Sequence, residues 1–171
     1  MIRKSVCPLW HADIPSDPTS ESTAISRQLH HSNGHDLDLD VAAPRDETTH
    51  VPASGFITHG SLERAWSGFV WMNPPFGGRN GLKPWLDKFF QHGNGIALTP
   101  DRTSAPWFHE AWTKAHLVLF TPKLRFIRPD GTDGKFPSNG TALWAAGDQA
   151  SVALRAAADR KLGILADPIS R

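Results

Sequence analysis

Short apolar segments dominate this sequence and limit what the chain can fold into. None of the candidate core segments is longer than seven residues, and each is interrupted by glycine, proline or a charged residue. Glycine and proline each occur 14 times among the 171 residues, which favours short and frequently terminated elements. A membrane-spanning helix needs about 18 apolar residues in a row, and no stretch approaches that length. We therefore expect a soluble globular protein built from many short strands and helices.

The N-terminal region and the cysteine content narrow the class of protein further. Residues 1–16 include basic residues but no apolar stretch, so we expect no secretory signal peptide. Cys7 is the single cysteine, which excludes an intrachain disulfide framework and a cysteine-rich zinc fold. Nine histidines are present, but their spacing does not resemble a metal site, and we predict no metal. These features favour a cytoplasmic protein without membrane contact.

Strand and helix patterns alternate through the middle of the chain. Residues 1–32 are rich in proline and polar residues and are predicted to be a weakly ordered segment. Residues 33–147 are expected to form one α/β domain, and 148–171 a C-terminal helix and tail. Strands are expected at 37–43, 68–72, 95–99 and 116–120, helices at 84–92, 104–115 and 149–162, and a hairpin from 124–128 and 141–145.

This alternation predicts an α/β fold with a mostly parallel sheet that ends in a C-terminal hairpin. Residues 44–67 are polar and irregular, and we expect no strand there. Sheets of this kind bind ligands at the carboxyl ends of their strands. Asp40 and Asn73 each fall near the end of an expected strand, so both are candidates for a binding site.

The segment Asn73-Pro74-Pro75-Phe76 directly follows an apolar strand and is the most specific feature of the sequence. The exocyclic amine of adenine is a poor nucleophile, because its lone pair is delocalised into the ring. The amide oxygen of Asn73 and the carbonyl of Pro74 would accept both amine hydrogens and stabilise the charge that develops on nitrogen. The two prolines hold these acceptors rigidly, and Phe76 offers a face for an extruded base. The alternative interpretation is a strand terminator without chemistry.

The wider sequence around this segment is similar to a known family. Met72-Asn73-Pro74-Pro75-Phe76-Gly77 resembles the catalytic motif of amino-group DNA methyltransferases, and the overall pattern resembles the phage-type DNA N-6-adenine methyltransferases. The resemblance spans roughly residues 36–147, about two-thirds of the chain. It departs at His59-Gly60-Ser61-Leu62, where the family has Asp-Gly-Leu. The other matches are at 39–43, Trp66, 69–77, 100–109, 124–126 and 136–138.

The resemblance implies a Rossmann-like sheet that binds S-adenosylmethionine and an enzyme that methylates N6 of adenine in double-stranded DNA. Only 32 residues separate Asp40 from Asn73, so the cofactor half of the sheet must be abridged. An Asp40 that only caps the following turn is the alternative. The implied catalytic residues are Asn73, Pro74, Pro75 and Phe76, and the implied cofactor-binding residues are Asp40, Val41, Ala42 and Asn73.

The charge distribution favours a polyanion as the partner of the second part of the chain. Residues 1–63 carry four Lys/Arg and nine Asp/Glu, whereas 64–171 carry fourteen and eight. Between 114 and 128 there are four basic residues and no acidic one, as expected for phosphate contact. Two solvated faces of opposite sign are the alternative. The residues expected to contact DNA are Arg102, Lys123, Arg125 and Ser138.

Two other functions stay open on the sequence alone. The first is a nucleic-acid-binding module that keeps the sheet but has lost catalysis, which the shortened cofactor region favours. The second is a methyltransferase that acts on another planar amine, such as a protein glutamine or a small molecule. The intact Asn-Pro-Pro-Phe segment argues against the first, and the basic second half of the chain favours DNA over the second.

Overall fold

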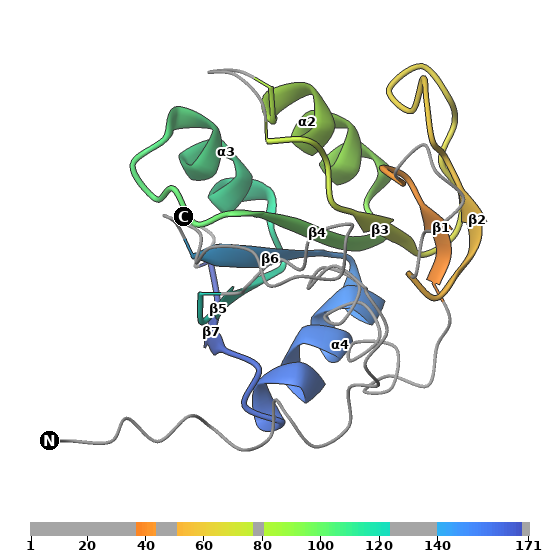
Figure 1. Ribbon diagram of the computed structural model, residues 1–171. Coiled ribbons are helices and arrows are strands. Elements are labelled where there is room, and N and C mark those ends of the chain that lie inside the picture. Colours follow the sequence, from red (N-terminus) through yellow and green to blue (C-terminus); the bar gives the residue numbers. More distant parts are fainter. Residues whose placement is uncertain (1–36, 44–50, 77–80, 124–139, 169–171) are drawn as a thin grey trace, which may run out of the picture.

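A seven-stranded sheet with three helices forms the body of the protein in the computed structural model, which describes residues 37–43, 51–76, 81–123 and 140–168 (Figure 1). The strands are β1 (Leu37–Asp40), β2 (Ala53–Phe56), β3 (Val70–Met72), β4 (Gly95–Pro100), β5 (Leu117–Thr121), β6 (Thr141–Ala146) and β7 (Ile164–Ala166). The helices are α2 (Lys83–His92), α3 (Pro106–Lys114) and α4 (Asp148–Asp159). None of the described helices is long and apolar enough to cross a bilayer.

The strand order is β2-β1-β3-β4-β6-β5-β7. The pairs β1–β2, β1–β3 and β3–β4 are parallel, whereas β4–β6, β5–β6 and β5–β7 are antiparallel. The α/β class is confirmed, but the prediction of a mostly parallel sheet is wrong because half of the pairings are antiparallel. The reversal arises at β6, which enters between β4 and β5 and runs against both.

The partner of β6 also differs from the prediction. We expected residues 141–145 to pair with 124–128 in a hairpin, but β6 pairs with β4 along one edge and with β5 along the other. All six of its residues are buried, and such a strand needs neighbours on both sides to satisfy its backbone. Residues 124–128 lie outside the described part of the chain.

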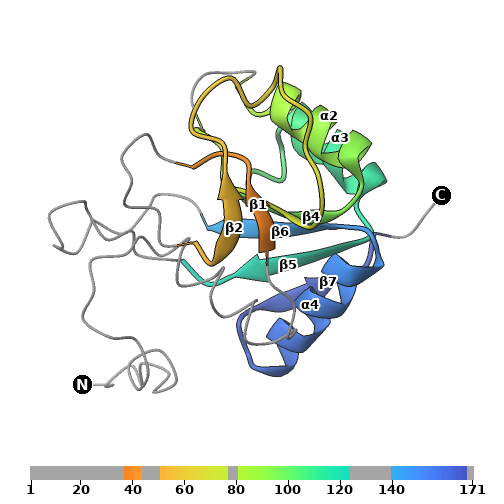
Figure 2. The ribbon, with the colours of Figure 1, turned by 90° about the vertical axis from the view of Figure 1, so that its right-hand side faces the viewer.

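The helices cover the two faces of the sheet in three layers (Figure 2). Helices α2 and α3 lie together on one face, where Phe89 and Phe108 pack into a core that also holds Met72 and Trp144. Helix α4 lies on the opposite face, where Leu154 packs with the second core around Trp71. These apolar stripes are the ones that the sequence indicates for α2 and α3.

Proline and glycine set the ends of α2 as expected. Pro84 lies in its first turn, and Gly93 ends it in the left-handed conformation with φ of 76°. Helix α3 also has proline, Pro106, in its first turn, but Ala105 is its N-cap residue and makes no side-chain capping bond. The helix therefore begins later than the predicted residue 104, and Thr103 and Ser104 both precede its N-cap residue.

Strands β2 and β7 were not expected from the sequence. Both lie at the edges of the sheet and are short, with partly exposed residues rather than a continuous apolar run. Strand β2 falls within residues 44–67, where we expected no strand. Its position beside β1 matters for the site, because it adds a third parallel strand end next to Asp40.

Candidate functional site

The carboxyl ends of β1 and β3 lie next to each other and carry the two strongest candidate residues. Asp40, the last residue of β1, is in register with Trp71, and Asn73 follows two residues after Trp71. The amide of Val41 donates a hydrogen bond of 3.0 Å to the carbonyl of Trp71. The structure therefore brings Asp40 and Asn73 to the same edge of the sheet, as the sequence predicts.

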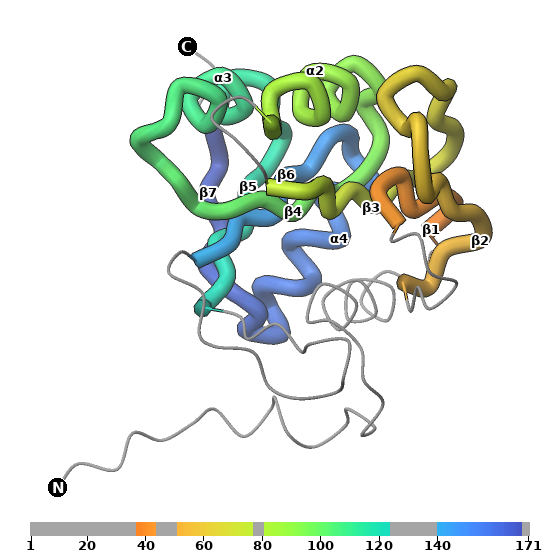
Figure 3. The backbone as a smooth tube through the Cα atoms, turned by 45° about the horizontal axis from the view of Figure 1, so that its top comes forward, coloured from red at the N-terminus to blue at the C-terminus, as the bar shows by residue number. Residues whose placement is uncertain are grey.

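The chain changes direction across the sheet at this point. From β1 it passes to β2 on one side and then returns to β3 on the other side of β1 (Figure 3). In open α/β sheets such a switch point leaves an opening outside the carboxyl ends of the strands, where ligands bind. Asp40 and Asn73 flank the switch point, so the topology singles out their edge of the sheet for binding.

Asp40 is a buried carboxyl group with little polar support. Its side chain is 3% exposed, and its Oδ1 accepts a hydrogen bond of 3.0 Å from the Ala42 amide. Burial raises the pKa of Asp40 to about 6, against the opposing effect of the Ala42 hydrogen bond. Among the described residues nothing donates to its Oδ2. A buried carboxylate oxygen without a partner is costly, which favours a role in binding.

The segment after β3 combines buried and exposed residues. Pro74 is buried, Asn73 is partly exposed, and Pro75 and Phe76 are exposed, Phe76 by 36%. Among the described residues no group forms a hydrogen bond with the Asn73 side chain. Its amide oxygen is thus available to a ligand, while Pro74 anchors the segment at the sheet edge. The ring of Phe76 presents an aromatic face to its surroundings rather than filling the core.

Strand β4 extends farther than β1 and β3 and makes a step in this edge. Because Asp40 is level with Trp71, and Trp71 with Ile96, β4 continues for four residues beyond the end of β1. At about 3.3 Å per residue the step is about 13 Å high. Thr99 in this part of β4 is fully buried, and its hydroxyl accepts a hydrogen bond of 2.8 Å from Trp144 Nε1 in the core.

Two of the predicted DNA contacts lie on top of this step. Arg102 follows the end of β4 and Lys123 follows the end of β5, and both are exposed. Thr141 of β6 is in register with Pro100 and with Thr121, so the strands that precede the two residues lie on either side of β6. At about 4.8 Å between neighbouring strands, the ends of β4 and β5 are about 10 Å apart. His109 Nε2 donates a hydrogen bond of 2.7 Å to the Thr103 carbonyl, which holds the loop that carries Arg102.

The remaining predicted site residues differ in burial, and two of them lie outside the described part of the chain. Val41 is fully buried and packs with the core on the α2 and α3 face, so only its backbone faces the strand end. Ala42 is partly exposed, and its amide is committed to Asp40. Arg125 and Ser138 lie outside the described residues, and their predicted roles stay predictions.

Phe56 belongs to the candidate site, but it is not among the site residues that the sequence predicts. It ends β2, is in register with Asp40, and is 43% exposed, which is unusual for a large apolar side chain. It thus places an exposed aromatic residue on the strand next to Asp40. The only signal for it was the short alternation of Ala53-Ser54-Gly55-Phe56, which lies in a polar region and resembles a loop as much as a strand.

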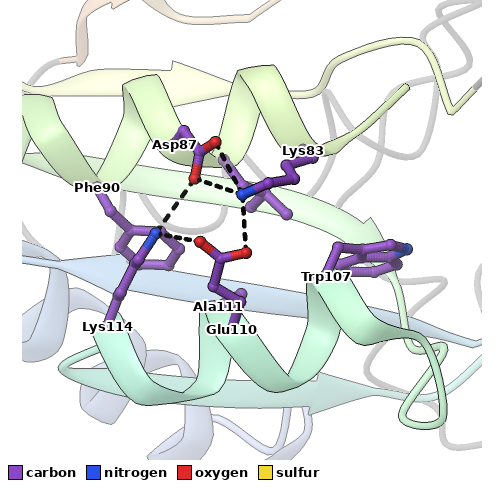
Figure 4. Close-up of a pocket in the computed structure, with 8 residues that line it drawn as sticks. Lys83, Asp87, Phe90, Trp107, Glu110, Ala111 and Lys114 are labelled. Carbon is purple, nitrogen blue, oxygen red and sulfur yellow. Dashed lines mark hydrogen bonds and ion pairs between the residues drawn. The ribbon is translucent and has the colours of Figure 1, made fainter. Parts of the chain in front are cut away.

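A shallow groove between α2 and α3 lies apart from this edge (Figure 4). All of its lining residues belong to these two helices, so it receives nothing from the strand ends. Lys83 and Lys114 alternate with Asp87 and Glu110 in a ring of ion pairs, with N–O distances of 2.7 to 3.1 Å. Hydrogen bonds from Lys114 and Lys83 lower the pKa of Glu110. The four side chains are exposed, and such pairs contribute little to stability.

No family model, curated protein or solved structure matches this chain at a significant level. Within the described ranges, no three His, Cys, Asp or Glu side chains converge in a way that would hold a metal ion. The candidate site therefore rests on the geometry of the strand ends.

Proposed function

We propose that this protein is an S-adenosylmethionine-dependent methyltransferase that acts on N6 of adenine in double-stranded DNA. The observation that carries this proposal is the adjacency of Asp40 and Asn73 across the switch point, with the Asn-Pro-Pro-Phe segment directly after β3. A strand terminator alone does not explain why, among the described residues, an amide without a hydrogen bond and a buried carboxylate with a single one lie at the same edge of the sheet.

The residues around β1 fit the proposed cofactor. Asp40 Oδ2 has no donor among the described residues, so it can accept hydrogen bonds from ligand hydroxyl or amino groups. Phe56 lies beside it and offers a face for a flat ring. S-adenosylmethionine supplies an electrophilic methyl group when bound, and the protein needs only to position it. The fold proposed with it is an abridged Rossmann-like methyltransferase sheet.

Asn73 and Pro74 would orient the amine that receives the methyl group. The Asn73 amide oxygen and the Pro74 carbonyl accept its two hydrogens, which localises the nitrogen lone pair and stabilises the positive charge in the transition state. The nitrogen then loses one proton to solvent. Because Pro74 is buried and both prolines restrict φ, the acceptors are held in place before the substrate arrives.

The exposed residues along the step fit a DNA substrate. Phe76 offers a stacking face to an adenine that has left the duplex, which offsets part of the few kcal/mol that unstacking costs. Arg102 and Lys123 follow strands whose ends are about 10 Å apart on the sheet edge, and both side chains are exposed, which suits contact with the phosphates of a backbone. The proposal assigns the DNA backbone to this side of the edge and the cofactor to β1 and β2.

A second candidate is a nucleic-acid-binding module without catalysis. In the described part of the chain the sheet extends beyond β1 by one strand, the four-residue β2, which leaves little protein to enclose a cofactor. This candidate keeps the roles of Arg102 and Lys123 and removes those of Asp40 and Asn73. Cofactor binding separates the two functions.

Isothermal titration calorimetry with S-adenosylmethionine tests the proposal. We expect saturable binding by the wild type, a loss of at least about tenfold in affinity for Asp40→Asn, and no change for Asp159→Asn, an exposed carboxylate in α4. ATP serves as the control ligand. A folded wild type that binds DNA but shows no heat with S-adenosylmethionine would support the second candidate instead.

A further inference from the structure

The connection between β2 and β3 is held by a lysine of the neighbouring helix. Residues 57–69 leave the end of β2, cross the face of the sheet beside α2, and return to the start of β3 (Figure 3). Ile57 and Phe69 are buried in the core at the two ends of this connection, and Trp66, which is 9% exposed, packs in the core with Leu86 and Phe89. The turn from Ser61 to Arg64 is held by polar contacts.

Lys88 of α2 directs its ammonium group into a turn of this connection. Its Nζ donates to the carbonyl of Ser61 at 3.0 Å, to that of Leu62 at 2.8 Å, and to that of Arg64. An ammonium group has three hydrogens, so these three carbonyls use all of its donors. Three backbone carbonyls that converge on one cation form a cage, and without Lys88 they would face one another with no positive charge between them.

Trp66 completes the enclosure of this cation. The Lys88 Nζ lies 5.0 Å from the centre of the Trp66 ring, within the range of a cation–π contact. The indole Nε1 of Trp66 also donates to the Ser61 carbonyl at 3.0 Å and lies 3.1 Å from the Ser61 hydroxyl. One helix residue and one tryptophan therefore fix the turn from Ser61 to Arg64 from two sides.

The fixed turn is tied to the strand end that carries Asp40. The amide of Ile57, the first residue of the connection, donates to the Asp40 carbonyl at 2.8 Å, and its carbonyl accepts from Ala43 at 3.1 Å. Within the turn, Arg64 contacts His59 at 3.2 Å, and His59 contacts Thr58 at 3.2 Å. A movement of the turn would therefore reach the wall of the site through residues 57–59.

We propose that Lys88 is a positioning residue that holds the β2–β3 connection as the outer wall of the cofactor site. This inference rests on the proposed function for the identity of the ligand, but the cage itself does not. Lys88 acts through the backbone of 57–66 and touches neither Asp40 nor Asn73 in the structure. Its loss is expected to loosen this wall while the sheet and the DNA-facing step keep their structure.

Two measurements on matched variants test the inference. Lys88→Met removes the cation from the cage, and Lys83→Met makes the same substitution in the same helix, where the side chain contacts only exposed carboxylates. For Lys88→Met we expect amide hydrogen exchange in 58–66 to accelerate at least about tenfold and the Kd for S-adenosylmethionine to rise about tenfold, with DNA affinity unchanged. Lys83→Met should change neither quantity.

A milder variant covers the possibility that Lys88→Met does not fold. Trp66→Phe keeps an aromatic ring under the cation but removes the indole donor to Ser61, and we expect about a threefold increase in both quantities. Unchanged exchange in 58–66, or equal effects of Lys88→Met and Lys83→Met, would overturn the inference. If the wild type binds no S-adenosylmethionine, the proposed function and the assigned wall role fail, and the exchange comparison then decides only whether the cage exists.

Discussion

Asp40 ends β1 and Asn73 follows the neighbouring parallel strand β3, and a hydrogen bond of 3.0 Å from the Val41 amide to the Trp71 carbonyl joins the two strand ends. The carboxylate is buried and raised in pKa, whereas the amide is partly exposed and engages no described residue. The two side chains thus divide one site into an enclosed part and an accessible part. This division suits a reaction in which a small cofactor is held inside and a large substrate approaches from outside.

The raised pKa of Asp40 predicts that this residue lowers the stability of the folded protein at neutral pH, although it contributes to cofactor binding. Its pKa is about 6 in the folded protein against an ordinary value of 3.8, so the folded state binds this proton more tightly than the unfolded state. Below pH 3.8 Asp40 is protonated in both states and does not lower the free energy of unfolding. Between pH 4 and 6 the free energy of unfolding falls progressively, and above pH 6 the ionisation of Asp40 lowers it by about 3 kcal/mol. Asp40→Asn should relieve this cost at neutral pH while weakening cofactor binding.

Urea unfolding of wild type and Asp40→Asn at several pH values measures the effect. The stability of the variant relative to the wild type should increase by about 2–3 kcal/mol between pH 4 and pH 8, with most of the change between pH 4 and pH 6. All other titrating groups are common to both proteins and cancel in the difference. A difference that stays constant with pH would contradict the assignment of a buried, desolvated carboxylate.

Asn73→Ala should abolish most methyl transfer without loss of the cofactor site. The variant removes one preorganised acceptor for the amine, and such a loss typically lowers the rate by about 10²–10³. S-adenosylmethionine affinity should stay nearly intact, because Asp40 and Phe56 are untouched. Single-turnover methylation together with calorimetry separates the two quantities. Equal losses in both would make Asn73 a structural residue of the strand end.

Phe76 separates an enzyme that extrudes its target base from one that does not. If Phe76 stacks on the extruded adenine, Phe76→Ala should impair methylation of a paired adenine more than of a mismatched one, where extrusion costs less. Phe76→Trp should retain activity, because any aromatic face serves. Rates on matched and mismatched duplexes, beside a melting curve, measure this. If Phe76→Ala slows methylation of both duplexes equally and lowers the stability of the protein by about 3–5 kcal/mol, as a core Phe→Ala change does, the stacking role is contradicted.

Arg102 predicts a defined change in the salt dependence of DNA binding. If the exposed side chain after β4 contacts one phosphate, Arg102→Ala should reduce the slope of log affinity against log salt by about one unit. The same change at Lys83, in the ion-pair ring between α2 and α3, should leave the slope unchanged. Fluorescence anisotropy with a labelled duplex gives both slopes. An affinity independent of salt would exclude the assigned DNA contacts.

The elements with continuous apolar patterns were predictable, and the edge strands were not. Strands β3 and β4 are apolar runs that end at proline-containing segments, and α2 has its stripe between Pro84 and Gly93. Strand β2 has a partly exposed, glycine-containing sequence that carries no such signal. The partner of β6 was mistaken for a different reason, because pairing between distant segments depends on which neighbours bury both edges of a strand.

The candidate site was predictable only to the level of its strand ends. The rule that parallel strands end at one edge places Asp40 near Asn73 without coordinates. The Asp40 oxygen that accepts from no described residue, the exposed side chain of Phe56 and the carbonyl cage around Lys88 follow from how the chain packs in three dimensions. No sequence pattern in residues 56–66 indicates these contacts.

The central claim is that the strand ends of β1 and β3 together transfer a methyl group to adenine in DNA. The most direct test incubates the protein with a duplex and S-adenosylmethionine that carries an isotope-labelled methyl group, and then identifies the labelled nucleoside by mass spectrometry. We predict labelled N6-methyldeoxyadenosine from the wild type at many turnovers per protein molecule, and a rate lower by about 10²–10³ from Asn73→Ala. Labelled cytosine, or no labelled nucleoside from a wild type that binds both ligands, would contradict the account.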